Sequence, residues 1–281
     1  MYKSMMIFFI LSMALTGCNE YIDSKKAQEA YAKGNYNEAV KLFTKTCDSG
    51  LSGGCYNLGN MYELGQGVQQ NQQKSLKLYE MACNGGIAQG CYKLGMNYQI
   101  GNPSQQSIPK AAIYYQKACD MGFAEGCNNL GRLYIEDNDM QKDAPKAVVF
   151  FEKACDGGSE MGCTNMGKMY SKGEGVKQDD IKAIEFFGKG CDKKSGLGCT
   201  FLGVVYRDGR GVKQDDHLAF EFLEKACMLE DPSGCTNLGM MYFDGQGVKK
   251  NNLKALEFFQ KSCDMEDKLG CENLAELKAL M

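Results

Sequence analysis

The chain has 281 residues, with 32 basic and 35 acidic side chains and a formal net charge of −3. The charges are spread evenly along the chain, which argues against a basic surface for nucleic acid or for a membrane. Only four prolines and no tryptophan occur. The segments rich in Ala, Lys, Leu, Glu and Met favour helix over strand.

The first residues predict export. Lys3 precedes an apolar, uncharged run from Met5 to Leu15, which is too short to span a bilayer and matches the core of a signal peptide. Leu15-Thr16-Gly17-Cys18 follows and resembles a bacterial lipobox. That resemblance implies cleavage before Cys18 and lipid modification of this cysteine. We therefore expect a signal peptide over residues 1–17.

Asn19 stands where an aspartate would favour inner-membrane retention, so the sequence slightly favours the outer membrane. We expect an exported protein in the bacterial envelope or periplasm, attached to membrane only through lipid. The alternative is an ordinary secretory signal, a chance cysteine and a freely secreted protein.

Fourteen of the fifteen cysteines form seven C-x7-C pairs that recur every 36 residues. The pairs are Cys47/Cys55, Cys83/Cys91, Cys119/Cys127, Cys155/Cys163, Cys191/Cys199, Cys227/Cys235 and Cys263/Cys271. Cys18 lies one residue out of this register and has no partner at the repeat spacing. Lipidation would explain why this cysteine alone is unpaired.

One repeat predicts two helices. Leu58, Gly59 and Tyr62 form a helical stripe after Cys55, and a turn follows at 65–68, Gly-Gln-Gly-Val. A second helical pattern begins at residue 71 and ends at residue 83. Glycine recurs after the leucine of the first helix although it costs about 1 kcal/mol in a helix, so we expect a neighbouring helix to approach closely there.

Two further columns support the second helix. Its first position holds residue types that cap helix N-termini, namely Asn71, Ser107, Asp143, Asp179, Asp215 and Asn251. A lysine recurs near its end, where positive charge suits the helix dipole, at Lys117, Lys153, Lys189, Lys225 and Lys261.

The Leu-Gly-x-x-Tyr, G-x-G-V and D-x-x-K-A patterns resemble Sel1-like repeats, which are relatives of tetratricopeptide repeats. The C-x7-C pairs resemble the Helicobacter cysteine-rich protein family. The resemblance implies an all-α, right-handed α/α solenoid of about seven helix pairs over residues 18–281. After Cys271 only one helix remains, with Ala275 in the glycine column, and it resembles a capping helix.

Each cysteine pair would join the end of a second helix to the start of the next first helix, where antiparallel ends can bring the Cα atoms within disulfide range. A zinc site would need closer spacing and usually histidine, whereas the single histidine, His217, falls in a variable surface column. Redox catalysis would favour C-x-x-C, which is absent. We expect structural disulfides, no metal and no cofactor.

The family resemblance also implies an alternative function, a penicillin-binding protein or weak β-lactamase that would take β-lactams or cell-wall fragments. Ser107 and Lys110 match S-x-x-K, but neither S-D-N nor K-T-G accompanies them and both fall in common repeat columns. We interpret Ser107 as a cap and name no catalytic residue.

A binding surface is the favoured hypothesis. In tetratricopeptide repeats the first helices line a concave groove with ligand-binding asparagines. The matching positions, two after each opening cysteine, hold five asparagines and two other residues: Asn57, Lys93, Asn129, Asn165, Phe201, Asn237 and Asn273. Such amides can bond the backbone of an extended peptide, or equally brace the preceding loop. Positions one and five after the cysteine vary and should flank this row. We expect a monomer that binds protein or peptide.

Overall fold

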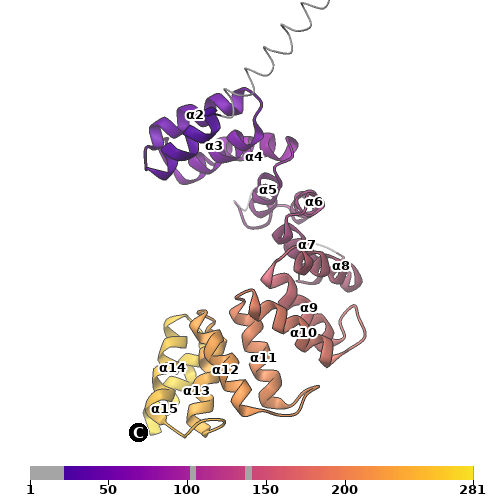
Figure 1. The fold of residues 1–281 in the computed structure, drawn as a ribbon, viewed down its shortest axis with the longest axis vertical. Helices are drawn as coiled ribbons and strands as arrows, with labels where there is room; N and C mark the ends of the chain where they lie inside the picture. Colours follow the sequence, from indigo (N-terminus) through magenta and orange to yellow (C-terminus); the bar gives the residue numbers. More distant parts are fainter. Residues whose placement is uncertain (1–21, 102–105, 137–140, 281) are drawn as a thin grey trace, which may run out of the picture. The chain divides into compact units, whose positions relative to one another are not determined.

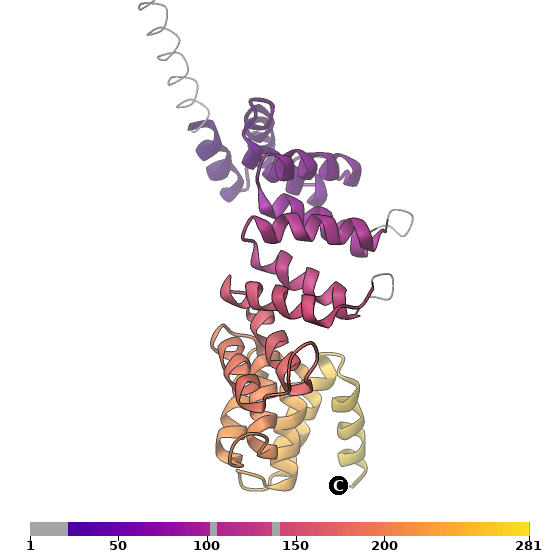
Figure 2. The same ribbon diagram turned by 90° about the vertical axis from the view of Figure 1, so that its right-hand side faces the viewer.

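The computed structural model describes residues 22–101, 106–136 and 141–280, and all regular structure there is helical. The signal peptide and Cys18 lie outside the described residues. Residues 22–32 form a helix, and the later helices are α2 (Tyr36–Asp48), α3 (Ser52–Leu64), α4 (Gln72–Asn84), α5 (Ala88–Ile100), α6 (Ile108–Asp120), α7 (Ala124–Glu136), α8 (Ala144–Asp156), α9 (Glu160–Lys172), α10 (Asp180–Asp192), α11 (Gly196–Asp208), α12 (Asp216–Met228), α13 (Pro232–Asp244), α14 (Asn252–Asp264) and α15 (Lys268–Leu280). Figures 1 and 2 show how loops join successive helices.

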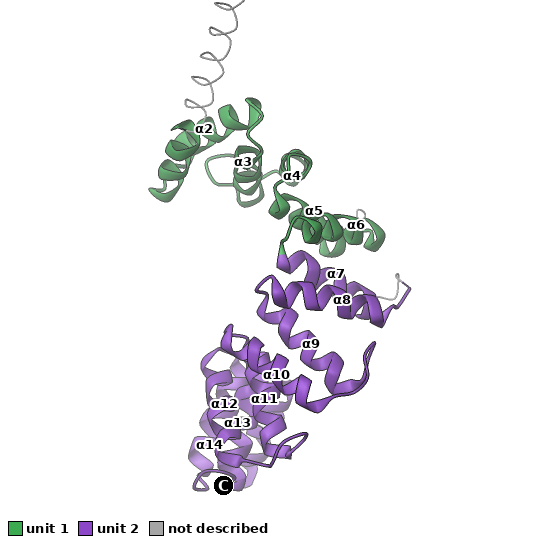
Figure 3. Ribbon diagram, turned by 45° about the vertical axis from the view of Figure 1, so that its right-hand side comes forward, with its two compact units in different colours: residues 1–123 green, residues 124–281 purple. Residues whose placement is uncertain are grey.

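The chain forms two compact units, residues 1–123 and 124–281, coloured separately in Figure 3. In both units an odd-numbered first helix packs against the even-numbered second helix that follows it. In the second unit the first helices also contact one another in sequence, from α7 to α9, α11, α13 and α15. These first helices therefore form a continuous layer in that unit.

Capping confirms most of the predicted second-helix starts. The side chains of Asn71, Asp143, Asp179, Asp215 and Asn251 each accept a hydrogen bond from a backbone N–H of the first turn. Ser107 precedes α6 but makes no such bond. The predicted lysines lie in the last turns, and several also lie over an aromatic ring one turn earlier, as Lys189 does 4.7 Å from the Phe186 centroid.

The first helices begin earlier than the sequence pattern indicated. Cys55 is the fourth residue of α3, and each later opening cysteine occupies the same place in its helix. The preceding glycine lets the helix end approach its neighbour: a Cβ at Gly90 would lie 2.9 Å from the Tyr79 carbonyl oxygen and 3.0 Å from the Cys83 nitrogen.

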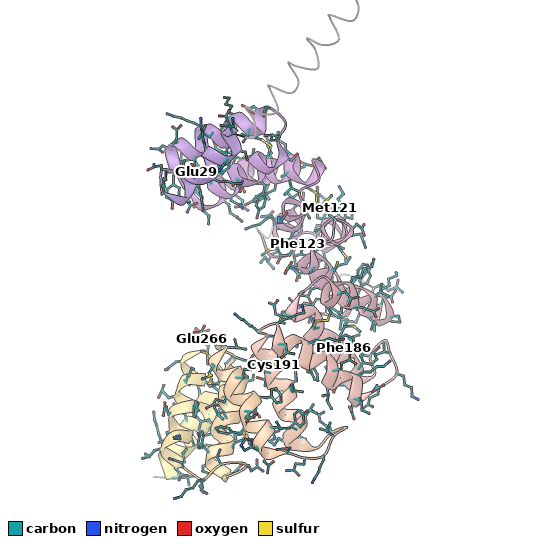
Figure 4. All side chains as sticks on the ribbon, in the orientation of Figure 1. Glu29, Met121, Phe123, Phe186, Cys191 and Glu266 are labelled. Atoms are coloured by element: carbon teal, nitrogen blue, oxygen red, sulfur yellow. A yellow bond between two sulfur atoms is a disulfide. The ribbon has the colours of Figure 1, made fainter. Side chains whose placement is uncertain are left out.

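This close approach produces the predicted disulfides. The Cα atoms lie 4.4–4.7 Å apart in the bonds Cys47–Cys55, Cys83–Cys91, Cys155–Cys163, Cys191–Cys199, Cys227–Cys235 and Cys263–Cys271. Cys119 and Cys127 are disulfide-bonded as well. Each bond joins the last turn of one helix to the first turn of the next (Figure 4, where Cys191 is labelled). The disulfides indicate an oxidising environment.

Candidate functional site

A pocket recurs where two neighbouring first helices flank one second helix. Pocket A, in the first unit, is lined by Glu63, Gln72, Leu76, Tyr79, Lys93, Met96, Asn97, Ile100 and Gly101. In the second unit, pocket B is lined by Ile135, Glu136, Phe151, Asn165, Lys168, Met169, Lys172 and Glu174. Pocket C there is lined by Met240, Phe243, Asp244, Phe259, Asn273, Glu276, Leu277 and Leu280.

These pockets are equivalent positions of the repeat. The aromatic residues Tyr79, Phe151 and Phe259 occupy one column, and so do Lys93, Asn165 and Asn273 two residues after an opening cysteine. The same geometry is therefore built with different side chains along the chain. Their volumes are about 130 Å³ for pocket A, 150 Å³ for pocket B and 250 Å³ for pocket C.

The aromatic floor explains the recurring glycine of the first helix. Tyr79, Phe187 and Phe259 are at most 3% exposed. A Cβ at Gly59 would lie 2.8 Å from the Tyr79 ring, and one at Gly239 would lie 2.6 Å from the Phe259 ring. The prediction of a close neighbour is confirmed, and the nearest contact is one side chain of the second helix, an aromatic ring except at Gly203, which faces Leu223. In α15 this column holds Ala275, which is exposed.

The polar side chains of pocket A bond to one another. The Tyr79 hydroxyl lies 2.7 Å from both Asn60 Oδ1 and Glu63 Oε2 and can donate its single proton to either, and Lys93 Nζ lies 2.8 Å from the same Glu63 oxygen. Burial, followed by the hydrogen bond to Glu63, raises the pKa of Tyr79 far above its usual value, so this hydroxyl stays protonated. The charges at this pocket are therefore compensated internally.

Pocket B carries side chains of both charges, and one of its polar residues is held by a neighbouring helix. Asn165 is 6% exposed, and its Nδ2 donates to Asn128 Oδ1 of the preceding first helix at 2.9 Å. Lys168 and Lys172 of α9 line the opening. The lining also holds two carboxylates: Glu136 pairs with Arg132 of its own helix, so Glu174 is the one acid there that faces the two lysines.

Pocket C combines apolar walls with two acids. Phe259 and Leu277 are buried, whereas Asp244 and Glu276 are exposed. The lining contains no basic side chain. Asn273 contributes an Nδ2 atom that is buried and has no hydrogen-bond partner among the residues that the structure describes.

The predicted asparagine row divides into different environments. Asn57 and Asn129 are half-buried, and Asn129 Oδ1 accepts a long bond from the adjacent Asn128 at 3.4 Å. Asn237 accepts from Arg207 at 2.8 Å and donates to the Ser233 carbonyl at 2.8 Å. Asn165 and Asn237 are thus engaged inside the protein, while Asn165 and Asn273 line pockets B and C.

The two flanking columns behave differently. Position five after the cysteine lines the pockets at Met96, Lys168 and Met240. The prediction that position one also flanks the asparagine row is wrong for Thr164 and Thr236, which are fully buried. Their hydroxyls bond to the next repeat, for example Thr164 Oγ1 to Ser195 Oγ at 3.0 Å. The burial of this position depends on how neighbouring repeats pack. The sequence did not indicate it, because the residue types at position one vary from repeat to repeat.

Three other sequence features have ordinary surroundings. Ser107 precedes α6, and Lys110 Nζ lies 5.3 Å from the Tyr98 ring centroid, as other lysines of its column do over theirs. His217 is exposed and lies 3.4 Å from Glu221.

Within the described residues, no cluster of His, Cys, Asp or Glu is suited to hold a metal ion. No helix in that part of the chain has the length and apolarity to cross a membrane.

Sequence comparison places these repeats among known proteins. The Sel1 repeat matches residues 28–51, 52–87, 88–123, 124–159, 161–195, 196–231 and 232–267. A 74-residue segment is 32% identical to "Putative beta-lactamase HcpD" of Helicobacter pylori, covering 24% of each chain. A 64-residue segment is 39% identical to HcpE of that species, which carries the same description, and covers 23% of this chain and 18% of HcpE. These matches therefore span a quarter or less of those proteins.

Solved structures extend the similarity over most of the chain. A Sel1 repeat protein from Oxalobacter formigenes has a TM-score of 0.79 and 25% identity, covering 86% of this chain and 99% of that one. The protein c5321, a protective antigen in uropathogenic Escherichia coli strains, has a TM-score of 0.75 and 26% identity, covering 85% of this chain and 51% of its own. The chain belongs to the Sel1 repeat family and is a disulfide-stapled, right-handed α/α solenoid of the type found in Helicobacter cysteine-rich proteins.

Proposed function

We propose that this protein is an exported scaffold whose first-helix face binds extended segments of partner proteins. One observation carries the proposal: equivalent pockets recur in the same repeat columns, each with different lining residues. Solenoids use such extended faces for binding, and a series of pockets at regular spacing suits a chain with side chains at regular spacing.

The disulfides support a binding role that depends on a rigid frame. Each closes a loop of nine residues between neighbouring helices, which restricts the unfolded chain and opposes separation of the repeats. A preformed face avoids part of the ordering cost that binding otherwise incurs. Of the predicted asparagines, Asn57, Asn129 and Asn273 remain the better candidates for ligand contact, because Asn165 and Asn237 make short bonds of 2.8–2.9 Å, whereas Asn129 accepts only a long bond of 3.4 Å.

Site-specific photo-crosslinking in the native cell envelope tests this proposal. A photoreactive amino acid at Lys168 or Met240 of the first-helix face should give covalent adducts with a partner. The same amino acid at Glu224 or Glu257, exposed on second helices, is the matched control and should give none. Adducts only from the second-helix positions, or none from any position, would contradict the proposal.

Export and anchoring form a separate part of the proposal. Residues 1–17 would be the signal peptide, and Cys18 would carry lipid and attach the chain to the envelope. The many disulfides and the out-of-register position of Cys18 support this. Globomycin should block processing, and Cys18→Ser should release the protein from the membrane fraction. Normal processing with globomycin would favour a freely secreted form.

The names of HcpD and HcpE raise β-lactam hydrolysis as a second candidate. The one matching motif does not support it, since Lys110 packs on Tyr98 and Ser107 occupies the helix-start column. Nitrocefin turnover by the purified, disulfide-bonded protein decides between the two functions: turnover above that of a reduced control would favour the enzyme.

A further inference from the structure

Pocket C has a chemistry that pockets A and B lack. Its floor and walls are apolar, with Phe259 and Leu277 buried and Phe243 half-buried. Asp244 and Glu276 lie at its rim, and neither makes an ion pair within the described residues. In pocket A, by contrast, the lining acid Glu63 is already paired with Lys93.

The size of pocket C suits a single side chain. Its volume of about 250 Å³ lies below the range of roughly 300–1,000 Å³ usual for drug-sized ligands. An apolar body with a charged end would match apolar walls and an acidic rim. Lysine and arginine have this form, with aliphatic stems that pack on apolar surface while the head stays in a polar environment.

Asn273 supplies a second reason to expect a peptide. Its buried Nδ2 bonds nothing in the described structure, and an unsatisfied buried donor costs about 1–3 kcal/mol. A rotation of this amide toward the pocket would let it donate to a carbonyl oxygen of a bound main chain. The equivalent Asn237 shows the alternative, since its Nδ2 is satisfied by the Ser233 carbonyl.

We infer that pocket C binds a lysine or arginine side chain from an extended segment of a partner protein. The stem would lie against Phe243, Phe259 and Leu277, and the cationic head would lie between Asp244 and Glu276. Arginine would add paired hydrogen bonds to a carboxylate. This inference rests on the proposed binding function and names the side chain that the second unit selects.

The charges of the second unit also predict the spacing between two charged residues of the bound segment. Pocket B has Lys168 and Lys172 against one acid without an ion pair in the described part of the chain, Glu174, because Glu136 pairs with Arg132, whereas pocket C has only the acids Asp244 and Glu276. Pockets B and C are three repeats apart, and contacting helices lie about 8–10 Å apart, so the separation is about 24–30 Å. An extended chain spans this in about eight residues at ~3.3 Å each. The preferred segment therefore carries an acidic residue about eight positions from the basic one.

Selection from random 15-residue peptides displayed on phage tests the inference on the disulfide-bonded protein. The wild-type protein should enrich peptides with Lys or Arg, and acidic residues about eight positions away. Asp244→Asn with Glu276→Gln should weaken binding of a selected peptide at least tenfold. Glu224→Gln with Glu257→Gln, which removes two exposed acids from second helices, should leave binding within twofold. Lys168→Gln with Lys172→Gln should abolish only the acidic preference. Circular dichroism of each variant verifies the fold.

The outcomes separate this inference from the broader function. Enriched peptides without a basic residue, or peptides insensitive to the Asp244 and Glu276 changes, would overturn the inference and leave peptide binding in place. Failure to enrich any peptide, together with no photo-adducts from the first-helix face, would overturn both.

Discussion

The two units join their repeats with different chemistry. In the first unit, apolar residues precede the first helices, Leu51 before α3 and Ile87 before α5, and the apolar Phe123 ends the unit. They meet aromatic residues of the preceding repeat, as Tyr56 packs in one cluster with Ile87, and the Tyr92 and Phe123 rings lie 5.0 Å apart (Figure 4, where Phe123 is labelled). These junctions are stabilised by apolar burial.

In the second unit the same positions carry hydrogen-bonding side chains. Asp231 accepts from the Gly234 backbone at 2.8 Å and from Thr200 at 2.7 Å, so one carboxylate caps a helix and connects two repeats. Asp267 does the same with Gly270 and Thr236. The difference shows that one backbone repeat tolerates either kind of junction, provided that both partner columns change together.

Removal of one disulfide from each unit should have the largest effect and should be similar in both. The loops are of equal length, so the loss should be about 2.6 kcal/mol for Cys83→Ala with Cys91→Ala and for Cys191→Ala with Cys199→Ala. Hydrogen exchange of the amides in each unit measures it. A loss confined to one unit would show that the side chains at the junction, and not loop closure, determine how much stability a disulfide contributes.

A methyl group in the first-helix glycine column should also disrupt both units. In Gly95→Ala the new Cβ would lie 2.5 Å from the Tyr115 ring, and in Gly167→Ala it would contact the Phe187 ring even more closely. Such overpacking typically costs about 1–3 kcal/mol, measurable by guanidinium unfolding. Gly188→Ala is the control: it has open space around it, so helix propensity should stabilise the protein by up to about 1 kcal/mol.

The polar junction should depend on one carboxylate. Asp231→Ala removes a cap and leaves the Thr200 hydroxyl without its acceptor, at a cost of about 2 kcal/mol from the two bonds. Asp231→Asn keeps an acceptor and should cost far less. In a double-mutant cycle, Thr200→Val and Asp231→Ala should be coupled by about 1 kcal/mol. Strict additivity would mean that the two repeats are joined by packing alone, as in the first unit.

Alkaline pH should destabilise the first unit selectively. Burial raises the pKa of Tyr79 in the folded state above the value near 10 of the unfolded chain. The contribution of Tyr79 to the free energy of unfolding is therefore complete below about pH 10 and is lost as the pH rises above it. The loss should be about 1.4 kcal/mol per pH unit, hence about 1.4 kcal/mol at pH 11. The second unit has Phe151 and Phe187 in this column.

Exchange rates of the two units at pH values from 9 to 11, after correction for intrinsic rates, measure this selectivity. Tyr79→Phe should remove most of the slope in the first unit, where burial also raises the pKa of Tyr114. An equal slope in both units would place the alkaline sensitivity elsewhere.

Local patterns predicted the repeat well, because its main interactions connect residues close in the chain. The C-x7-C spacing implied antiparallel helix ends within disulfide reach, and most second-helix caps bond only three residues ahead. The start of the first helix was predicted three residues late, since Leu51 and Ile87 do not resemble caps. The cap signal is clear only in the second unit, at Ser195 and Asp231.

The candidate site was less predictable, because it is assembled from three helices. Asn165 and Asn273 share a column, yet one is braced by Asn128 and the other has an unsatisfied donor. Thr164 looked like a groove residue and is buried against Ser195. Such differences depend on which side chains the neighbouring repeat places against the residue. The residue types at one repeat position do not show this.

The sequence by itself determined the period, the helical class, the cysteine pairing and the membership of a repeat family, since each depends on spacing along one chain segment. The tertiary structure decided which columns are buried, where the pockets lie and which charges remain uncompensated. These properties depend on the angle and distance at which adjacent repeats pack. The acids of pocket C remain without an ion pair because no basic side chain from a neighbouring helix reaches them within the described residues.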